Sequence, residues 1–196
     1  MSVDTVQIKK NQIELLLDSQ KLLDKCSIAE FLEPLYFSYA ELNTKNNLEL
    51  QNKIKFYCAG IKENLIYTIS LRNPLPVQDI QSAILKYKRK KIHALSKVNV
   101  PTKDWDEVGS VLYVGSSKGS NYTTRIKNHL GVGSKGVYSL HLTRWIPEIA
   151  NAGIVIRTFT LEEPSHEYNN INLLEIIEQG FWDELKPMFG KRSGLL

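Results

Sequence analysis

The sequence predicts an α+β protein in which a small, mainly antiparallel sheet is flanked by helices. Short apolar segments rich in β-branched and aromatic residues are typical of strands, and they alternate with segments whose apolar residues recur at helical spacing. The expected strands are residues 65–71, 92–98, 110–116 and 154–161. Of the 196 residues, 42% are hydrophobic and 23% are charged, and these globular proportions exclude wholesale disorder.

Residues 1–85 are expected to form a mostly helical N-terminal extension. Within residues 6–25, isoleucine and leucine recur at near-helical spacing, which predicts an amphipathic helix. Residues 27–30 match a capping box, so a second helix is expected to begin there. The polar residues 43–52 fit either a loop or the start of a helix, whereas residues 65–71 are a strand.

Residues 86–196 are expected to form a second unit with a three-stranded central sheet. A helix capped by Asp79 leads into this unit. Segments 92–98 and 110–116 are expected to pair as a hairpin with a long loop, and segment 154–161 supplies the third strand. The expected helices lie around residues 123–130, 147–152 and 171–185, while residues 137–145 fit a strand and a helix equally well.

Positive charge is concentrated in the middle of the chain. Residues 86–144 carry a net charge of +9, whereas the segments before and after them carry −1 and −4. This field suits a polyanion such as nucleic acid, because the cations replace its condensed counterions. The densest run, residues 86–91, also fits a solvated helix end whose cations favour the C-terminal dipole. The candidate nucleic-acid contacts are Lys88, Arg89, Lys90, Lys91, Lys118 and Lys127.

The sequence also indicates in which cellular compartment the protein is expected. No window approaches the roughly 18 consecutive apolar residues of a membrane helix. The N-terminal residues lack the apolar core and cleavage site of a signal peptide. Cys26 and Cys58 alone make neither a metal quartet nor a disulfide framework. We therefore expect a cytoplasmic protein with reduced thiols and no membrane partner.

Two short motifs carry side chains suited to phosphate chemistry. Residues 113–115, Tyr-Val-Gly, close an expected strand, although a buried aromatic ring beside a turn glycine explains them as well. Arg125 and His129 lie four residues apart, on one face of an expected helix. Arginine binds phosphate bidentately and stays charged, and histidine donates a hydrogen bond or moves a proton. The alternative is an ordinary solvent-facing pair.

Glu178 is a carboxylate in an otherwise apolar helical segment. One interpretation turns it to solvent beside Glu175. The other points it into a cleft, where it holds a divalent cation, since Mg²⁺ is held by one or two carboxylates together with phosphate oxygens of the substrate.

Taken together and in this order, these motifs resemble the GIY-YIG nuclease family over roughly residues 90–194. That family shows two short strand motifs, then Arg and His on a helix, then a Glu on a later helix. Residues 113–115 match the second strand motif. Arg125 follows Gly115 by ten residues and His129 follows four later, as in the family, and Glu178 takes the place of the family's glutamate.

The sequence departs from the family's pattern at two positions. The first strand motif is best matched by residues 91–93, with His93 where the family has Tyr. Ile66 and Tyr67 are a second candidate, but Tyr67 lies 46 residues before Tyr113, far from the family's short hairpin. At the other end, the family's Pro is present at residue 187, whereas Gly190 stands where Asn is usual.

The resemblance implies a divalent-metal-dependent endonuclease that hydrolyses phosphodiester bonds in nucleic acid, DNA in preference to RNA. One Mg²⁺ or Mn²⁺ on Glu178 would polarise the phosphate, and Arg125 would stabilise the developing charge. His93 or Tyr113 is the expected base or water-positioning group, with His129 in support. A core histidine is the alternative for His93.

Two other functions fit the same sequence. One is an inactive nucleic-acid-binding module on the same scaffold, which the departures at His93 and Gly190 favour. The other is a protein-interaction domain whose basic segment meets an acidic partner. A homodimer is compatible with all three interpretations.

Overall fold

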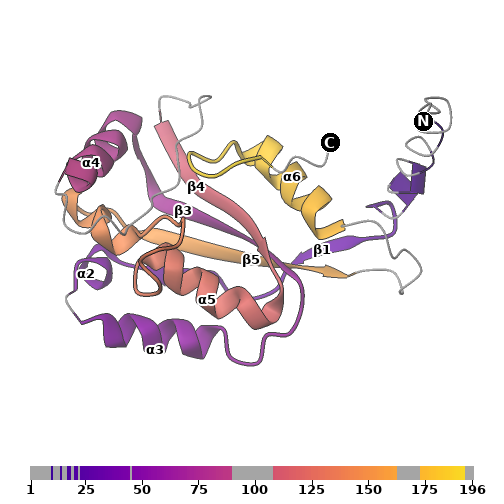
Figure 1. Cartoon of the computed structure of the whole chain (residues 1–196), viewed down its shortest axis with the longest axis horizontal. Helices are drawn as coiled ribbons and strands as arrows, with labels where there is room; N and C mark the ends of the chain where they lie inside the picture. Colours follow the sequence, from indigo (N-terminus) through magenta and orange to yellow (C-terminus); the bar gives the residue numbers. More distant parts are fainter. Residues whose placement is uncertain are drawn as a thin grey trace, which may run out of the picture.

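The structure, a computed structural model, is described for residues 10, 14, 17, 18, 20, 21, 23–44, 46–89, 108–162 and 173–192. A five-stranded antiparallel sheet runs through it, with helices on both sides (Figure 1). The strands are β1 (Ser27–Glu30), β2 (Leu35–Phe37), β3 (Leu65–Pro76), β4 (Val108–Ser117) and β5 (Ile154–Glu162). The helices are α2 (Tyr39–Leu42), α3 (Asn47–Tyr57), α4 (Val77–Arg89), α5 (Gly119–Leu130) and α6 (Leu173–Leu185), with 3₁₀ turns η1 (Leu142–Arg144) and η2 (Ile146–Glu148).

Strand β3 is the centre of the sheet, because it pairs with β4 on one side and with β5 on the other. Strands β1 and β2 pair with the two ends of β5. Side chains alternate between the faces of a strand. Tyr67 and Ile69 therefore point toward the face that α5 covers, where Tyr67 meets the ring of Tyr122. Thr68 and Ser70 point toward the opposite face, which α6 covers.

The α+β class is confirmed, but the expected count of three strands is wrong. Residues 27–76, assigned to a mostly helical extension, supply β1, β2 and β3. Residues 27–30 form a strand paired with residues 159–162 of β5 and do not begin a helix. A capping box stabilises a helix by only about 1 kcal/mol, which pairing within a sheet outweighs. The capping box that does form joins Ser38 to Glu41 at the start of α2.

Strand β4 pairs with β3, a pairing that the sequence did not predict. Residues 92–98 lie outside the described part of the chain. The strands expected at residues 65–71, 110–116 and 154–161 are confirmed, and β3 runs on to Pro76. The helices expected after Asp79 and around residues 123–130 and 171–185 are observed as α4, α5 and α6. Helix α4 begins at Val77, so Asp79 lies in its first turn and is not its N-cap. The helix expected over residues 147–152 is only the 3₁₀ turn η2, and the described residues from 10 to 23 are helical.

The boundary expected between residues 85 and 86 falls within α4. Strands from both sides of it share one sheet, and one cluster of buried side chains joins the two parts. Its largest fully buried members are Phe37, Tyr67, Tyr122, Trp145 and Phe189. The indole N–H of Trp145 donates to the carbonyl oxygen of Leu140 at 2.7 Å, so burial leaves this polar atom satisfied.

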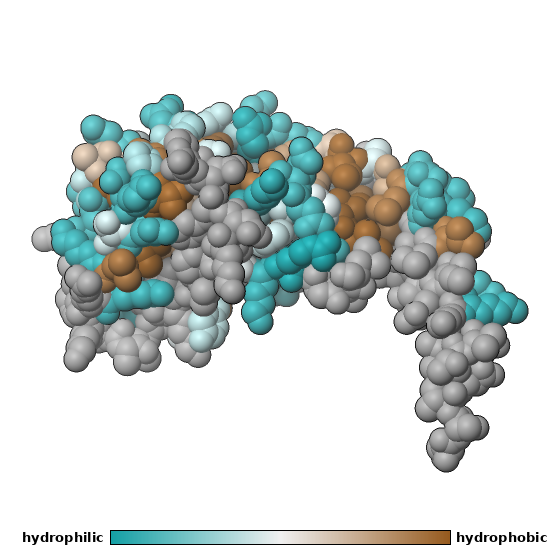
Figure 2. Space-filling model, turned by 90° about the horizontal axis from the view of Figure 1, so that it is seen from above, coloured by the Kyte–Doolittle hydropathy of each residue, from teal (hydrophilic) through white to brown (hydrophobic). Residues whose placement is uncertain are grey.

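Seen from above, on the side where α6 lies, apolar residues gather to the right of the centre among hydrophilic ones (Figure 2). Ile28 of β1 is among the exposed large apolar residues of the described chain. None of the described helices is long and apolar enough to cross a membrane.

Helix α5 is fixed at both ends by glycine. Gly131, with φ +86°, ends the helix in the left-handed conformation, and its N–H is donated to the carbonyl oxygens of Lys127 and Asn128. Gly119 begins the helix against the backbone of Lys62, where a Cβ atom would lie 2.5 Å from the carbonyl carbon. This contact sets how closely α5 approaches the loop before β3.

Replacing Gly119 with alanine is expected to lower the free energy of unfolding by about 1–3 kcal/mol, because backbone must move to admit the methyl group. Urea denaturation measures the effect. Gly136→Ala is the matched control, since a Cβ atom there would meet nothing within 4 Å. Equal stability of the two variants would contradict the close approach.

Candidate active site

Two tyrosines from neighbouring strands meet at one glycine. Tyr67 of β3 lies opposite Gly115 of β4 in the register of the sheet. A Cβ atom on Gly115 would lie 2.6 Å from Cε1 of Tyr113 and 2.9 Å from the hydroxyl oxygen of Tyr67. The ring centroids of the two tyrosines are 6.1 Å apart. Glycine at this position is therefore what lets both rings occupy one place.

Helix α5 brings Arg125 and His129 to the same place. The Nε–H of Arg125 donates to the hydroxyl oxygen of Tyr67 at 3.0 Å, and Nε2 of His129 lies 3.1 Å from that oxygen. The His129 ring also packs on Tyr113, with centroids 4.3 Å apart. The spacing of four residues thus places both side chains on one helix face, as the sequence predicted.

The hydrogen bonds of His129 fix its tautomer. The backbone N–H of Leu140 donates to Nδ1 at 3.4 Å, so Nδ1 accepts and the proton is on Nε2. Nε2 then donates to the hydroxyl oxygen of Tyr67. Burial, assisted by the charge of Arg125, lowers the pKa of His129 to about 3. The imidazole is therefore a neutral hydrogen-bond donor at physiological pH.

The hydroxyl oxygen of Tyr67 accepts two N–H groups, one from Arg125 and one from His129. Burial raises the pKa of Tyr67, and Arg125 opposes the shift. Tyr113 is half-buried, and burial likewise raises its pKa against the opposing effect of Arg125. Both tyrosines are neutral phenols at neutral pH.

Glu178 approaches from α6, on the other face of the sheet. The hydroxyl of Ser116 on β4 donates to Oε2 of Glu178 at 2.5 Å. Burial raises the pKa of Glu178, while Ser116 and Arg125 act in the opposite direction. The guanidinium and the carboxylate thus act on each other electrostatically, although their helices lie on opposite faces.

The chain beyond α6 covers the free edge of β4. The N–H groups of Met188 and Phe189 each donate at 3.0 Å, to the carbonyl oxygens of Val111 and Leu112. The next residue, Gly190, has φ +106°, and a Cβ atom on it would lie 3.2 Å from Cε2 of Tyr113. Gly190, placed by the resemblance where Asn is usual, therefore contacts the cluster but offers it no side chain.

Of the expected catalytic residues, Tyr113 packs on His129, and Arg125 and His129 both lie within hydrogen-bond distance of Tyr67, whereas Glu178 is linked to Arg125 only electrostatically. The resemblance assigned His93 to the strand motif beside residues 113–115. In the sheet, Tyr67 of β3 pairs with Gly115 at this place. His93 itself lies outside the described residues. In the sequence analysis Tyr67 belonged to the second candidate for the first strand motif, which was disfavoured because Tyr67 lies far from Tyr113 along the chain.

Nothing in the sequence indicated a role for Ser116 beyond its position directly after Gly115.

Among the expected nucleic-acid contacts, Lys88 is exposed on α4 and Lys118 is exposed at the start of α5. Lys127 is half-buried on α5, and Arg89 is the last residue of α4. Lys90 and Lys91 lie outside the described residues.

Glu178 is the carboxylate that the sequence analysis assigned to a divalent cation. No group of three or more His, Cys, Asp or Glu side chains placed to hold a metal occurs in the described part of the chain. A single carboxylate suits Mg²⁺ or Mn²⁺ when phosphate oxygens of a substrate complete the coordination.

Comparison of the chain with family models, curated proteins and solved structures finds no match.

The His129 ring is expected to stay neutral from pH 8 down to about pH 5, as measured by ¹⁵N NMR of the imidazole. Its folded pKa is about 3, below the ordinary 6.5. Below pH 6.5 the unfolded chain takes up a proton that the folded chain does not, so stability falls as the pH falls, by up to about 1.4 kcal/mol per pH unit.

The variant His129→Gln serves as the reference in urea denaturation at pH 7 and pH 5. Wild-type protein is expected to lose more stability than this variant between the two values. A ring that titrates near pH 6.5 would contradict the buried, neutral imidazole.

Proposed function

We propose that the protein is a divalent-metal-dependent endonuclease that hydrolyses phosphodiester bonds in nucleic acid, DNA in preference to RNA. The observation that carries the proposal is the convergence of Arg125, two tyrosines and Glu178 from three separate stretches of the chain. The resemblance of these motifs to GIY-YIG nucleases supports the same reaction. The net charge of +9 on residues 86–144 supports a polyanionic substrate.

Arg125 is suited to stabilise the transition state. Its Nε–H donates to the hydroxyl oxygen of Tyr67, and its charge acts on the phenol of Tyr113. A guanidinium has five N–H donors, so others remain for the equatorial oxygens of a phosphate. Because Tyr67 fixes the plane of the guanidinium before substrate binds, its charge needs no reorganisation when negative charge develops on those oxygens.

Tyr113 is the proposed group that positions the attacking water or accepts its proton. The oxygen of Tyr67 is fully buried and already accepts two N–H groups, which leaves Tyr113 as the more accessible phenol. Arg125 counteracts the effect of burial on the pKa of Tyr113. His129 supports the arrangement as a neutral donor to Tyr67.

Glu178 would hold the divalent cation, with Ser116 orienting its carboxylate. When bound, the cation supplies charge neutralisation of the phosphate and of the leaving oxygen. Glu178 contributes a carboxylate that the hydroxyl of Ser116 holds at strand β4.

Purified protein with Mg²⁺ or Mn²⁺ is expected to nick supercoiled plasmid. Arg125→Ala and Glu178→Gln are each expected to lower the rate at least about 10²-fold, since each removes a group that acts on the developing charge. Asp183→Asn is the control on α6, because that exposed carboxylate is paired with Arg192 outside the cluster. Binding without nicking by the wild-type protein would favour an inactive binding module instead.

Lys118 is exposed beside Ser116 and is expected to contact phosphate. Lys118→Ala should weaken duplex DNA binding about equally for all sequences, and should reduce the slope of log K against log salt by about 0.9. Fluorescence anisotropy over a salt series measures the slope. Lys21→Ala is the control, since Lys21 is paired with Asp18. Wild-type affinity that stays flat with salt would favour a protein partner.

A further inference from the structure

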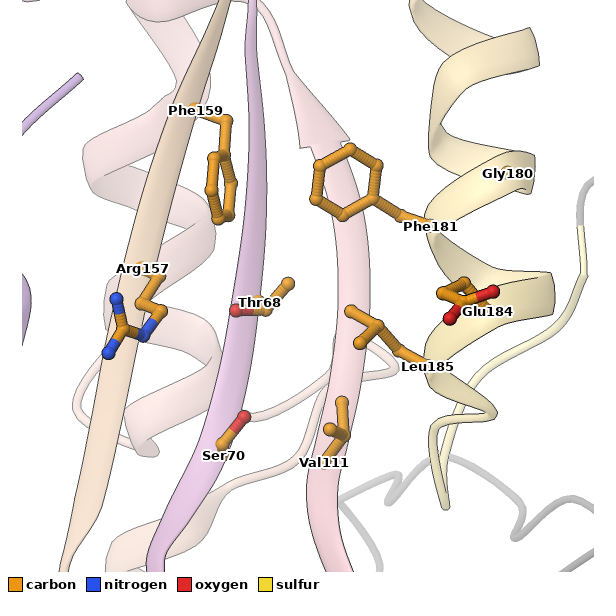
Figure 3. Close-up of a pocket in the computed structure, with 9 residues that line it drawn as sticks. All are labelled: Thr68, Ser70, Val111, Arg157, Phe159, Gly180, Phe181, Glu184 and Leu185. Carbon is orange, nitrogen blue, oxygen red and sulfur yellow. The ribbon is translucent and has the colours of Figure 1, made fainter. Parts of the chain in front are cut away.

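A pocket of about 420 Å³ lies between α6 and the sheet, on the face opposite to Tyr67 (Figure 3). Residues from β3, β4, β5 and α6 line it. Its volume is within the range of small-ligand sites. None of the residues assigned above to the cluster around Arg125 lines it. The pocket is thus a second feature of the molecule, separate from the proposed catalytic cluster.

The walls of the pocket are mainly apolar and include two aromatic rings. Phe159 of β5 and Phe181 of α6 point toward each other above β3, with centroids 5.1 Å apart (Figure 3). Val111 and Leu185 close the other end. The rings are tilted by 56°, so they leave no slot between them, and each can offer its face or edge to a flat ligand.

The polar groups of the pocket are hydroxyls at its floor and two charges. Thr68 and Ser70 of β3 each carry a hydroxyl that can donate or accept a hydrogen bond. Arg157 is paired with Glu30 at 2.9 Å, and Glu184 adds a negative charge from α6. Because the guanidinium is already paired and a carboxylate lies nearby, the lining favours a ligand without net charge over an anion.

Gly180 has no structural reason to be glycine. It lies in the interior of α6, where glycine costs about 0.5–1 kcal/mol relative to alanine. A Cβ atom on it would meet nothing within 4 Å, so no close packing requires its absence. Gly180 lines the pocket and is exposed to solvent.

We propose that this pocket binds one nucleobase of the substrate strand, unstacked from its neighbours, beside the phosphate that the catalytic cluster receives. This inference rests on the proposed nuclease function. Gly180 and Phe181 follow Glu178 by two and three residues, a rise of about 3–5 Å along α6. A base attached to a phosphate near Glu178 is therefore within reach of the pocket.

The shape, charge and hydrogen-bonding groups of a nucleobase match the residues that line the pocket. A base is flat and uncharged, it stacks on aromatic rings with a gain of about 1–3 kcal/mol, and its edge pairs with hydroxyls. Enzymes that take a base out of the stack bind it in such pockets, through aromatic contacts and a few edge hydrogen bonds.

The test uses the full-length protein and backbone-amide NMR. Thymidine 5′-monophosphate and deoxyadenosine 5′-monophosphate are titrated, with deoxyribose 5-phosphate as the probe that lacks a base. The expected result is a saturable shift of the amides of Thr68, Gly180 and Phe181 with the nucleotides alone. No such shift, or an equal shift with deoxyribose 5-phosphate, would overturn the proposal.

Gly180→Leu is expected to weaken nucleotide binding at these amides at least tenfold, because it adds a large side chain at a position that lines the pocket. Gly180→Ala is the control and should bind as wild type does. Phe159→Leu, which keeps an apolar side chain but removes the ring, should also weaken binding several-fold. If all three variants bind equally well, the pocket is not the site.

Failure of this inference and failure of the nuclease proposal are distinguishable. Glu178→Gln leaves the pocket intact, so it should show the same amide shifts even though plasmid nicking is lost. Plasmid nicking by wild type without any nucleotide shift at the pocket would sink this inference alone. Nucleotide shifts without any nicking by wild type would sink the nuclease proposal and leave a base-binding protein.

Discussion

The close approach of two tyrosines across Gly115 is the constraint on which the candidate site depends. A single methyl group at this position would overlap both Tyr113 and Tyr67. With hydrogen there instead, the Tyr67 hydroxyl reaches Arg125 and His129 on α5, and Tyr113 packs on the imidazole. The pairing of β3 with β4 fixes this arrangement, because the register sets Tyr67 directly opposite Gly115.

The cluster combines one permanent positive charge with neutral hydrogen-bonding groups. Arg125 is charged at any relevant pH, and its field helps to keep His129 neutral. Leu140 occupies Nδ1 of that ring, which leaves Nε2–H to hold Tyr67. The hydrogen bond to the Tyr67 hydroxyl orients the guanidinium of Arg125. The positive charge of Arg125 then suits the negative charge of a substrate phosphate.

Strand β4 connects all the parts of the proposed function. Strand β4 pairs with β3 along one edge and carries Tyr113 and Gly115. Its carbonyl oxygens accept hydrogen bonds from the backbone of residues 188–189, and its Ser116 donates to Glu178. Helix α6 carries the carboxylate and, within the next two turns, one wall of the pocket. A nucleotide bound at this edge would thus meet the catalytic groups and the pocket through the same two elements.

The sequence by itself determined the local elements and much of the site. Short apolar segments rich in β-branched and aromatic residues located β3, β4 and β5, helical patterns located α5 and α6, and the spacing of Arg125 and His129 placed both on one face. Its amino acids also singled out Tyr113 and Glu178 as groups suited to phosphate chemistry. These features depend on neighbours within a few residues, which a sequence displays directly.

Only the tertiary structure decided which strands pair and what meets across the sheet. The five-strand order, the role of Tyr67, the contact between Ser116 and Glu178 and the pocket all join segments distant along the chain. The separation of 46 positions between Tyr67 and Tyr113 argued for a different partner, yet the entropy of closing a loop grows only with the logarithm of its length, by about 0.6 kcal/mol per doubling. A long connection is therefore a weak obstacle to pairing, and the burial of β3 between β4 and β5 outweighs it.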